Sequence, residues 1–227
     1  MYVTHSTQTD GTHGPCHAIA APQSRKQAHV WTRHTTGSHL FHEGDAAAFV
    51  YEVRSGSVRL TRVLENGRRQ VIAFGLPGDI IGFPNGDRHH TDCDIIANAD
   101  IVAYPRRMLE TEGADPQTHQ RLLDAALNEI TAMQDHFMML GRKSAVEKVA
   151  SFLLVLAQRT GTLSDGGMMF SLPMSRADIA DFLGLTVETV SRTFSLLRKR
   201  GIISLETPQT VSVHDHGGLV AASQDPE

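Results

Sequence analysis

The chain has 227 residues, 41% of them hydrophobic, and a formal net charge of −4, which allows one or two domains; we expect two. The longest apolar run, FLLVLA at 152–157, is far shorter than the roughly 20 residues of a membrane-spanning helix, so we exclude an integral membrane protein. Neither an early basic cluster nor an apolar signal segment is visible. Two cysteines, Cys16 and Cys93, are too few for a disulfide framework. These features predict a cytoplasmic protein.

The basic residues are clustered near the C-terminus, so the acidic overall balance does not exclude a nucleic-acid partner. Between Val187 and Arg200 the chain has four basic residues and a single acidic one, Glu188. A local excess of positive charge can attract a phosphate backbone even when the whole chain is acidic.

The first 114 residues are expected to hold a tail and a β-domain. Residues 1–28 are rich in Thr, Gly, His and Gln without apolar periodicity, which predicts a disordered tail. Residues 29–114 contain short strand-like segments with glycines about every 8 to 12 residues, and Asn66-Gly67 is a strong hairpin signal. This pattern predicts an all-β barrel or jelly roll, which we call the β-roll.

A long helix is expected at 115–141. Asp115 can act as the N-cap, with Pro116 at the first helical position. Apolar residues then recur at alternating spacings of three and four, the pattern of a coiled-coil seam. This pattern predicts a dimerisation helix, although an amphipathic helix could instead pack on the β-roll. The seam residues are Leu123, Ala126, Ile130, Met133, Phe137 and Leu140.

Two further helices with a tight turn between them are expected after residue 174. Ser175 can cap the first helix together with Asp178, and Gly184 breaks it. Thr186 can cap the second helix, which ends before Gly201. This arrangement is typical of a helix-turn-helix.

The surrounding segments complete a winged helix-turn-helix domain at 142–217. A helix is expected at 145–159 and a loop at 164–167. Two strand-like segments around Pro208 form the wing, and residues 218–227 are expected to be a flexible tail. The predicted fold class of the whole chain is therefore α+β.

The second helix of the predicted helix-turn-helix carries a polar face near its N-terminal end. Glu188, Ser191 and Arg192 stand at i, i+3 and i+4 and share that face, which is the part of a recognition helix that enters the major groove. Arg can bond guanine and Glu can accept from cytosine, so we predict base-reading residues; the alternative is a simple surface ion pair. The predicted contacts to the DNA backbone are Ser175, Arg176, Thr186, Thr189, Arg198 and Lys199.

The segments HLFHEGD, RSGSVRL, LPGDIIGF and SRADIADFLGLTVETVSR closely resemble the CRP/FNR superfamily of bacterial transcription regulators, and its FixK-type branch most of all. The resemblance implies a cyclic-nucleotide-binding-like β-roll, a dimerisation helix and a winged helix-turn-helix. It also implies that Glu188, Ser191 and Arg192 read a TTGAT half-site in an inverted repeat. Such proteins control anaerobic, microoxic or nitrogen-fixation genes and contact RNA polymerase, usually through a loop that matches residues 73–77.

The residues with which this superfamily binds two of its effectors, a cyclic nucleotide and an iron–sulfur cluster, are missing from this sequence. Its cyclic nucleotide site uses a Glu and an Arg-Ser pair, whereas this chain has Phe83 after Gly82 and Thr91-Asp92 in the later region, with Asp94 close by. Carboxylates there would repel a phosphate. An iron–sulfur cluster needs four thiolates, and the chain has two cysteines.

We therefore predict a regulator with no cofactor, no metal and no obvious effector, active as a homodimer. The alternative is a redox-, haem- or metal-responsive regulator of the same family. Ligands could come from Cys16-His17, or from His89-His90 with Cys93, although neither has zinc-finger spacing. Ser175 occupies the position of a redox cysteine found in some FixK-type proteins.

An enzyme of the cupin type is a third possibility that we reject. Its candidate ligands would be His39, His42 and Glu43, but these lie where the family has a turn between strands.

Overall fold

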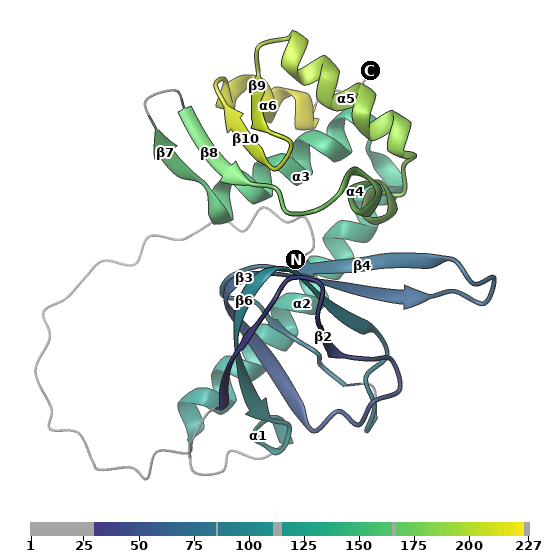
Figure 1. Cartoon of the computed structure of the whole chain (residues 1–227), viewed down its shortest axis with the longest axis vertical. Coiled ribbons are helices and arrows are strands. Elements are labelled where there is room, and N and C mark those ends of the chain that lie inside the picture. The colour runs from purple at the N-terminus through teal and green to yellow at the C-terminus, as the bar shows by residue number, and fades with distance from the viewer. Residues whose placement is uncertain (1–29, 85, 111–114, 165–166, 225–227) are drawn as a thin grey trace, which may run out of the picture.

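The computed structural model describes residues 30–84, 86–110, 115–164 and 167–224, and the tail expected at 1–28 lies outside these ranges. The chain forms two units. A β-sheet unit and a mainly helical unit are connected by one long helix, α2 (Pro116–Arg142), as Figure 1 shows.

The N-terminal unit is an antiparallel β-roll, as predicted. The main path of its sheet is β1-β6-β3-β4, with β2 paired to β6 and β5 paired to β3. β3 and β4 form the hairpin predicted at Asn66-Gly67, where Gly67 has a φ of 77°. The strands are β1 (Val30–His34), β2 (His39–Phe41), β3 (Phe49–Val63), β4 (Arg69–Gly75), β5 (Ile80–Ile81) and β6 (Asp92–Pro105).

Gly56 allows the long strand β3 to bend against β6. Its φ is 77°, and a Cβ at this position would lie 2.1 Å from the carbonyl oxygen of Asn98. The pairing register shifts on both sides of Gly56, between Val53 and Val58. A side chain would therefore be excluded both by backbone conformation and by space.

The helix α2 is attached to the β-roll along one face. It follows the short helix α1 (Arg107–Glu110), and the Asp115 side chain accepts a hydrogen bond from the backbone N–H of Thr118, as predicted for an N-cap. Arg121 pairs with Glu52 of β3, which is 2% exposed, and the Tyr104 hydroxyl donates to the same carboxylate at 2.6 Å. A buried carboxylate needs such partners, so this network fixes the position of the N-terminal half of α2.

The opposite face of α2 is apolar and exposed. Four of the six predicted seam residues are exposed, Phe137 to 75%, and Ala126 is half-buried. These residues do not pack on the β-roll of their own chain, so the alternative interpretation is wrong for them. Leu140 differs from the prediction, because it is half-buried and packs against the apolar core of the helical unit. The four exposed residues are Leu123, Ile130, Met133 and Phe137.

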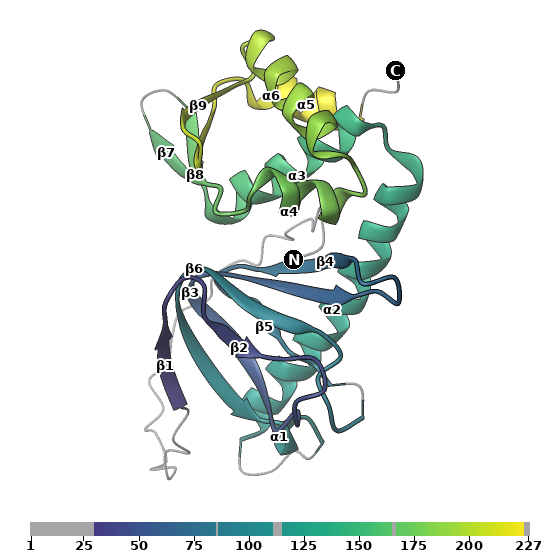
Figure 2. The same ribbon diagram turned by 45° about the vertical axis from the view of Figure 1, so that its right-hand side comes forward.

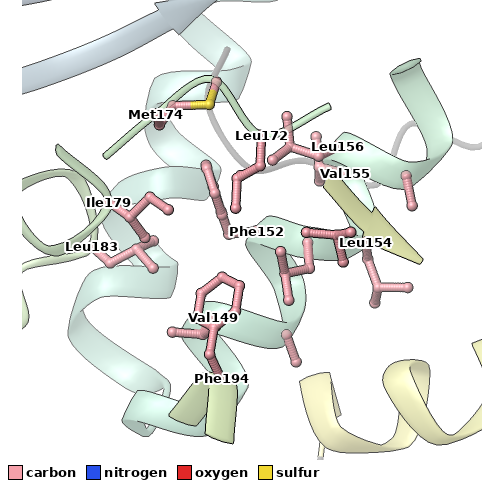
Figure 3. Close-up of a cluster of buried hydrophobic side chains, with 14 of the residues drawn as sticks. Val149, Phe152, Leu154, Val155, Leu156, Leu172, Met174, Ile179, Leu183 and Phe194 are labelled. Atoms are coloured by element: carbon pink, nitrogen blue, oxygen red, sulfur yellow. The ribbon is translucent and has the colours of Figure 1, made fainter. Parts of the chain in front are cut away.

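The C-terminal unit is a winged helix-turn-helix built around α3. Every residue of α3 from Val149 to Ala157 is buried, because the helices and strands of this unit pack around it. Figure 3 shows Phe152 of α3 among side chains such as Leu172, Ile179 and Phe194. The elements are α3 (Ala145–Thr160), β7 (Thr162–Ser164), β8 (Gly167–Ser171), α4 (Arg176–Leu183), α5 (Val187–Lys199), β9 (Ile203–Thr207), β10 (Thr210–Val213) and α6 (His216–Gln224).

Two parts of this unit differ from the sequence-based expectation. The predicted loop at 164–167 is flanked by β7 and β8, which extend the wing into a four-stranded sheet of order β7-β8-β10-β9. The flexible tail expected at 218–227 is wrong for residues up to Gln224, because α6 buries Leu219 and Ala222. Packing on α3 overrides the two adjacent glycines, Gly217 and Gly218.

The segment 73–77, expected as a loop for polymerase contact, also differs. Residues 73–75 belong to β4, and the side chains of Ala73, Phe74 and Leu76 are buried. These three side chains face the cores and are not available to a partner.

None of the helices in the described ranges is long and apolar enough to cross a bilayer.

His136 of α2 lies at the contact between the two units. Its ring stacks on Phe182 of α4, with 4.2 Å between the ring centroids, and 8% of the residue is exposed. Burial lowers the pKa of His136 from 6.5 to about 4, despite a hydrogen bond with the backbone of Phe182. The folded protein therefore holds this imidazole neutral at pH values where the unfolded chain would protonate it.

We expect acidification to destabilise the protein through His136. Below pH 6.5 the unfolded state gains a proton that the folded state accepts only near pH 4, so stability falls as the pH falls through this window. Between pH 7 and pH 5 the loss is up to about 2 kcal/mol. Urea unfolding at several pH values should show a smaller loss for His136→Gln. An equal loss in the variant would assign the pH dependence to another group.

Candidate nucleic-acid interface

The two helices α4 and α5 are held at their ends by the residues that the sequence predicts. The Ser175 hydroxyl accepts from the backbone N–H of Asp178 at 3.0 Å, and the Asp178 carboxylate accepts from the backbone N–H of Ser175 at 3.2 Å, which completes the capping box. Gly184 ends α4 in the left-handed region with a φ of 62°. Thr186 accepts from the backbone N–H of Thr189 at 3.1 Å and caps α5. The helix-turn-helix frame is thus set by local contacts.

The face of α5 that carries the predicted base-reading residues is exposed. The inward residues Val190, Phe194 and Leu197 are buried. Glu188, Ser191 and Arg192 are all exposed, and α5 lies on the side of its unit away from the β-roll (Figures 1 and 2). A long polymer could approach this face from the side opposite the β-roll.

The alternative ion pair is present on the same face. The Arg192 guanidinium donates to the Glu188 carboxylate, and the two side chains are 79% and 71% exposed. Such a pair contributes little to stability because solvent screens it. Arg has five N–H donors, so Arg192 can keep Glu188 as a partner and still present donors to a base edge. The Ser191 hydroxyl donates to the Val187 carbonyl at 2.9 Å and keeps acceptor capacity.

Three of the six predicted backbone contacts meet in one groove. The groove has a volume of about 570 Å³ and lies between the start of α4, the end of α5 and the wing. Its lining includes Ser175, Arg176 and Arg198, together with Thr207 and Gln209 of the wing. Hydroxyl, amide and guanidinium groups of this kind suit the oxygens of a phosphate backbone.

The six predicted backbone-contact residues differ in their exposure and in the contacts that they already make within the chain. The Arg176 guanidinium carbon lies 3.5 Å from the ring centroid of Phe194, and burial lowers the pKa of Arg176. The Ser175 hydroxyl is engaged with Asp178, so a phosphate contact would have to share it. Arg198 and Lys199 are exposed at the C-terminal end of α5, and Thr186 and Thr189 lie at its N-terminal end. A DNA contact by any of the six stays a prediction.

Sequence reasoning missed two features of this interface. The wing residues Thr207 and Gln209 line the groove, but polar turn residues give no specific signal. Arg59 and Arg69 of the β-roll contact Asp178 of α4, more than 100 positions away along the chain. No local pattern could indicate that pairing.

The candidate ligands for a sensor are scattered within the described residues. His89 and Cys93 are buried whereas His90 is exposed, and Cys16 lies outside the described ranges. The rings of His39 and His42 are tilted relative to each other, with 4.5 Å between their centroids. In the ranges that the structure covers, no three His, Cys, Asp or Glu residues are placed to hold a metal ion.

Known proteins resemble both units of the chain. Residues 31–108 match the cyclic nucleotide-binding domain, and residues 147–222 match the Crp-like helix-turn-helix domain. The nitrogen fixation regulation protein FixK of Azorhizobium caulinodans is 39% identical over 209 residues, covering 88% of this chain and 84% of that protein. The transcriptional activator protein FnrL of Cereibacter sphaeroides is 37% identical over 207 residues, covering 88% and 83%.

Solved structures give a similar result. The structure of FixK2 from Bradyrhizobium japonicum has a TM-score of 0.78 and 33% sequence identity, and the match covers 88% of this chain and all of that one. The arrangement of β-roll, long helix and helix-turn-helix is therefore shared with a relative of clear sequence similarity.

Replacing Arg192 by alanine should weaken sequence discrimination at one base pair. A bidentate contact to a base edge contributes roughly 1 to 3 kcal/mol, so Arg192→Ala should lose about this much on the preferred duplex and lose preference at that position. Affinities for all single-base-pair variants of the duplex measure this.

The matched control is Arg198→Ala on the same helix. It removes the same charge and should weaken binding to every duplex alike, with a flatter salt dependence. If Arg192→Ala keeps the wild-type preference at every base pair, Arg192 is not a base-reading residue.

Proposed function

Because the chain belongs to the CRP/FNR family of transcription regulators, in its FixK-like group, we propose that it is a homodimeric activator that binds a TTGAT-N4-ATCAA palindrome without a small-molecule effector. The observation that carries this proposal is the free face of α5, where Glu188, Ser191 and Arg192 stand together on a well-capped helix. Relatives named as nitrogen fixation regulators support control of nitrogen-fixation genes, or of related microoxic and anaerobic genes. RNA polymerase is the proposed partner at the promoter, and the bacterial cytoplasm the proposed location.

The chemistry of the three outward residues supports this type of half-site. Arg192 supplies forked donors that suit guanine O6 and N7, and Glu188 supplies an acceptor for cytosine N4. A G·C pair in the half-site presents both of these groups in the major groove. The Glu188–Arg192 pair holds the guanidinium beside the carboxylate before DNA arrives, which reduces the ordering needed on binding.

The exposed face of α2 supports a homodimer. Leu123, Ile130, Met133 and Phe137 lie along one side of a 27-residue helix and leave a continuous apolar stripe in solvent. Exposed apolar stripes of this kind mark interaction surfaces. A second copy offers the same stripe, and a two-fold dimer would match the two-fold symmetry of a palindrome.

The packing inside the β-roll supports the proposal that no cyclic nucleotide binds there. The rings of Phe41 and His89 stack at 3.8 Å, and Tyr51 stacks on Phe41 at 5.5 Å. A Cβ at Gly82 would already lie 3.1 Å from Tyr51, so side chains fill the space beneath this turn. Phe83 follows where the family has a Glu, and Thr91-Asp92 stands in the region of the family's Arg-Ser pair.

The state of Cys93 supports the absence of a redox switch at this residue. The residue is fully buried, and burial raises the pKa of its thiol. Since the thiolate is the reactive form, this cysteine is a poor target for oxidation. We therefore propose that the amount of protein, and not a bound ligand, sets its activity.

Selection of duplexes from a random pool, with and without oxygen, tests the proposal directly. We expect enrichment of TTGAT-N4-ATCAA by purified protein free of metal and small molecules, to the same extent in both conditions. Enrichment only without oxygen, or only after a ligand is added, would support the redox-, haem- or metal-responsive alternative. Absorbance and metal analysis of the same preparation would identify a chromophore or ion.

Placing a charge in the stripe should separate dimer formation from DNA reading. Ile130→Asp should lower affinity for the full palindrome by at least about ten-fold, because burying an unpaired carboxylate in the dimer costs several kcal/mol. Affinity for a single half-site should change little. Analytical ultracentrifugation should show a monomer at concentrations where the wild type is a dimer. Equal losses on both duplexes, or an unchanged dimer, would contradict this role of α2.

A further inference from the structure

A side-chain network joins the β-roll to the helix-turn-helix. Arg59 of β3 bridges two carboxylates, with Nη2 2.6 Å from Asp94 Oδ2 and Nη1 2.7 Å from Asp178 Oδ1. Arg69 of β4 donates to the same Oδ1 at 2.9 Å. The side chains of Arg59 and Asp178 are 17% and 6% exposed, so the contact is largely shielded from solvent. Shielded charge-assisted bonds of this length are strong and directional.

The two carboxylate oxygens of Asp178 contact different units of the protein. Oδ1 faces the guanidinium groups of the β-roll, while Oδ2 accepts from the backbone N–H and the hydroxyl of Ser175 at 3.2 and 2.7 Å. Burial alone would raise the pKa of Asp178, but hydrogen bonds from Ser175 and the charge of Arg59 hold it below its ordinary value. The residue that caps α4 is therefore also the residue by which the β-roll holds α4.

The backbone between the two units does not by itself fix their relative orientation, which depends on side-chain contacts across the joint. After α2 ends at Arg142, Lys143 and Ser144 adopt extended conformations before α3 begins. Two extended residues can act as a hinge, because small changes in their dihedral angles swing the whole helical unit. Gln70 adds a further contact across the joint, with its Nε2 2.6 Å from the carbonyl oxygen of Asp181.

We propose that Arg59, through Asp178, is a positioning residue that sets the orientation of α5 relative to α2 and thereby the half-site spacing that the protein accepts. This inference rests on the proposed function, since it requires a dimer on a palindrome. In such a dimer the distance between the two recognition helices depends on the angle between each helical unit and α2. A firmly held angle favours one spacing, and a loosened angle allows several.

The test compares affinities for four duplexes, one with the four-base-pair spacer, one with a spacer one base pair shorter, one with a spacer one base pair longer, and a single half-site. We expect Arg59→Gln to reduce the preference for the four-base-pair spacer by about ten-fold, the change expected from losing one hydrogen bond to a charged group. Half-site affinity should stay within about two-fold of the wild type, because α5 itself is untouched. Arg59→Lys keeps the charge but cannot bridge both carboxylates, so its preference should be intermediate.

The matched control is Arg62→Gln on the same strand. This variant has the same change in charge as Arg59→Gln. The Nε of Arg62 lies 3.7 Å from Oε1 of Glu43, which belongs to the β-roll itself, so the variant should keep the wild-type spacer preference. Thermal unfolding checks each variant. If Arg59→Gln is unfolded at the assay temperature, Arg69→Gln replaces it, because Arg69 shares Asp178 Oδ1 and is more exposed, so that its loss should disturb folding less.

Three outcomes would overturn the inference and can be told apart. A folded Arg59→Gln variant with the wild-type spacer preference would overturn the positioning role alone, as would equal losses on all four duplexes including the half-site. A wild-type protein without preference for the palindrome over the half-site would overturn the proposed function, and the positioning role with it.

Discussion

The attachment of α2 to the β-roll determines where the remaining surfaces of the molecule lie. Arg121 and the buried Glu52 fix the N-terminal half of the helix, and His136 against Phe182 places its C-terminal half beside the helical unit. One face of the helix is used by these contacts, so its remaining apolar residues stay in solvent. The same helix thus supports the contact within the chain and, in the proposed dimer, supplies the surface for a second chain.

The parts of the fold that depend on local contacts could be predicted from the sequence. Ser175 with Asp178, and Thr186 with Thr189, are only three positions apart, and their capping bonds follow from residue type and spacing. The hairpin at Asn66-Gly67 is local in the same sense. The outward direction of Glu188, Ser191 and Arg192 follows from helix periodicity, but the ion pair between two of them is a choice among rotamers that periodicity does not determine.

The features that depend on distant contacts could not be predicted. The helix α6 contains adjacent glycines and forms because Leu219 and Ala222 pack on the core around α3. Leu140 follows the seam spacing, yet the helical unit lies close enough to bury part of it. The contact of Asp178 with the β-roll, in addition to its capping role, could not be predicted for the same reason, because Arg59 is 119 positions away along the chain. These are cases in which tertiary packing decides what local propensity leaves open.

The exposed stripe on α2 has a consequence for how a cell could control such a regulator. Where the protein is mostly monomeric, the amount of dimer rises with the square of the total concentration, so doubling synthesis gives about four times as much dimer. A palindrome occupied only by dimers would then respond more steeply than the supply of protein itself. A regulator without a ligand would gain a threshold from mass action alone, and Phe137, the most exposed residue of the stripe, would be the natural place to tune it.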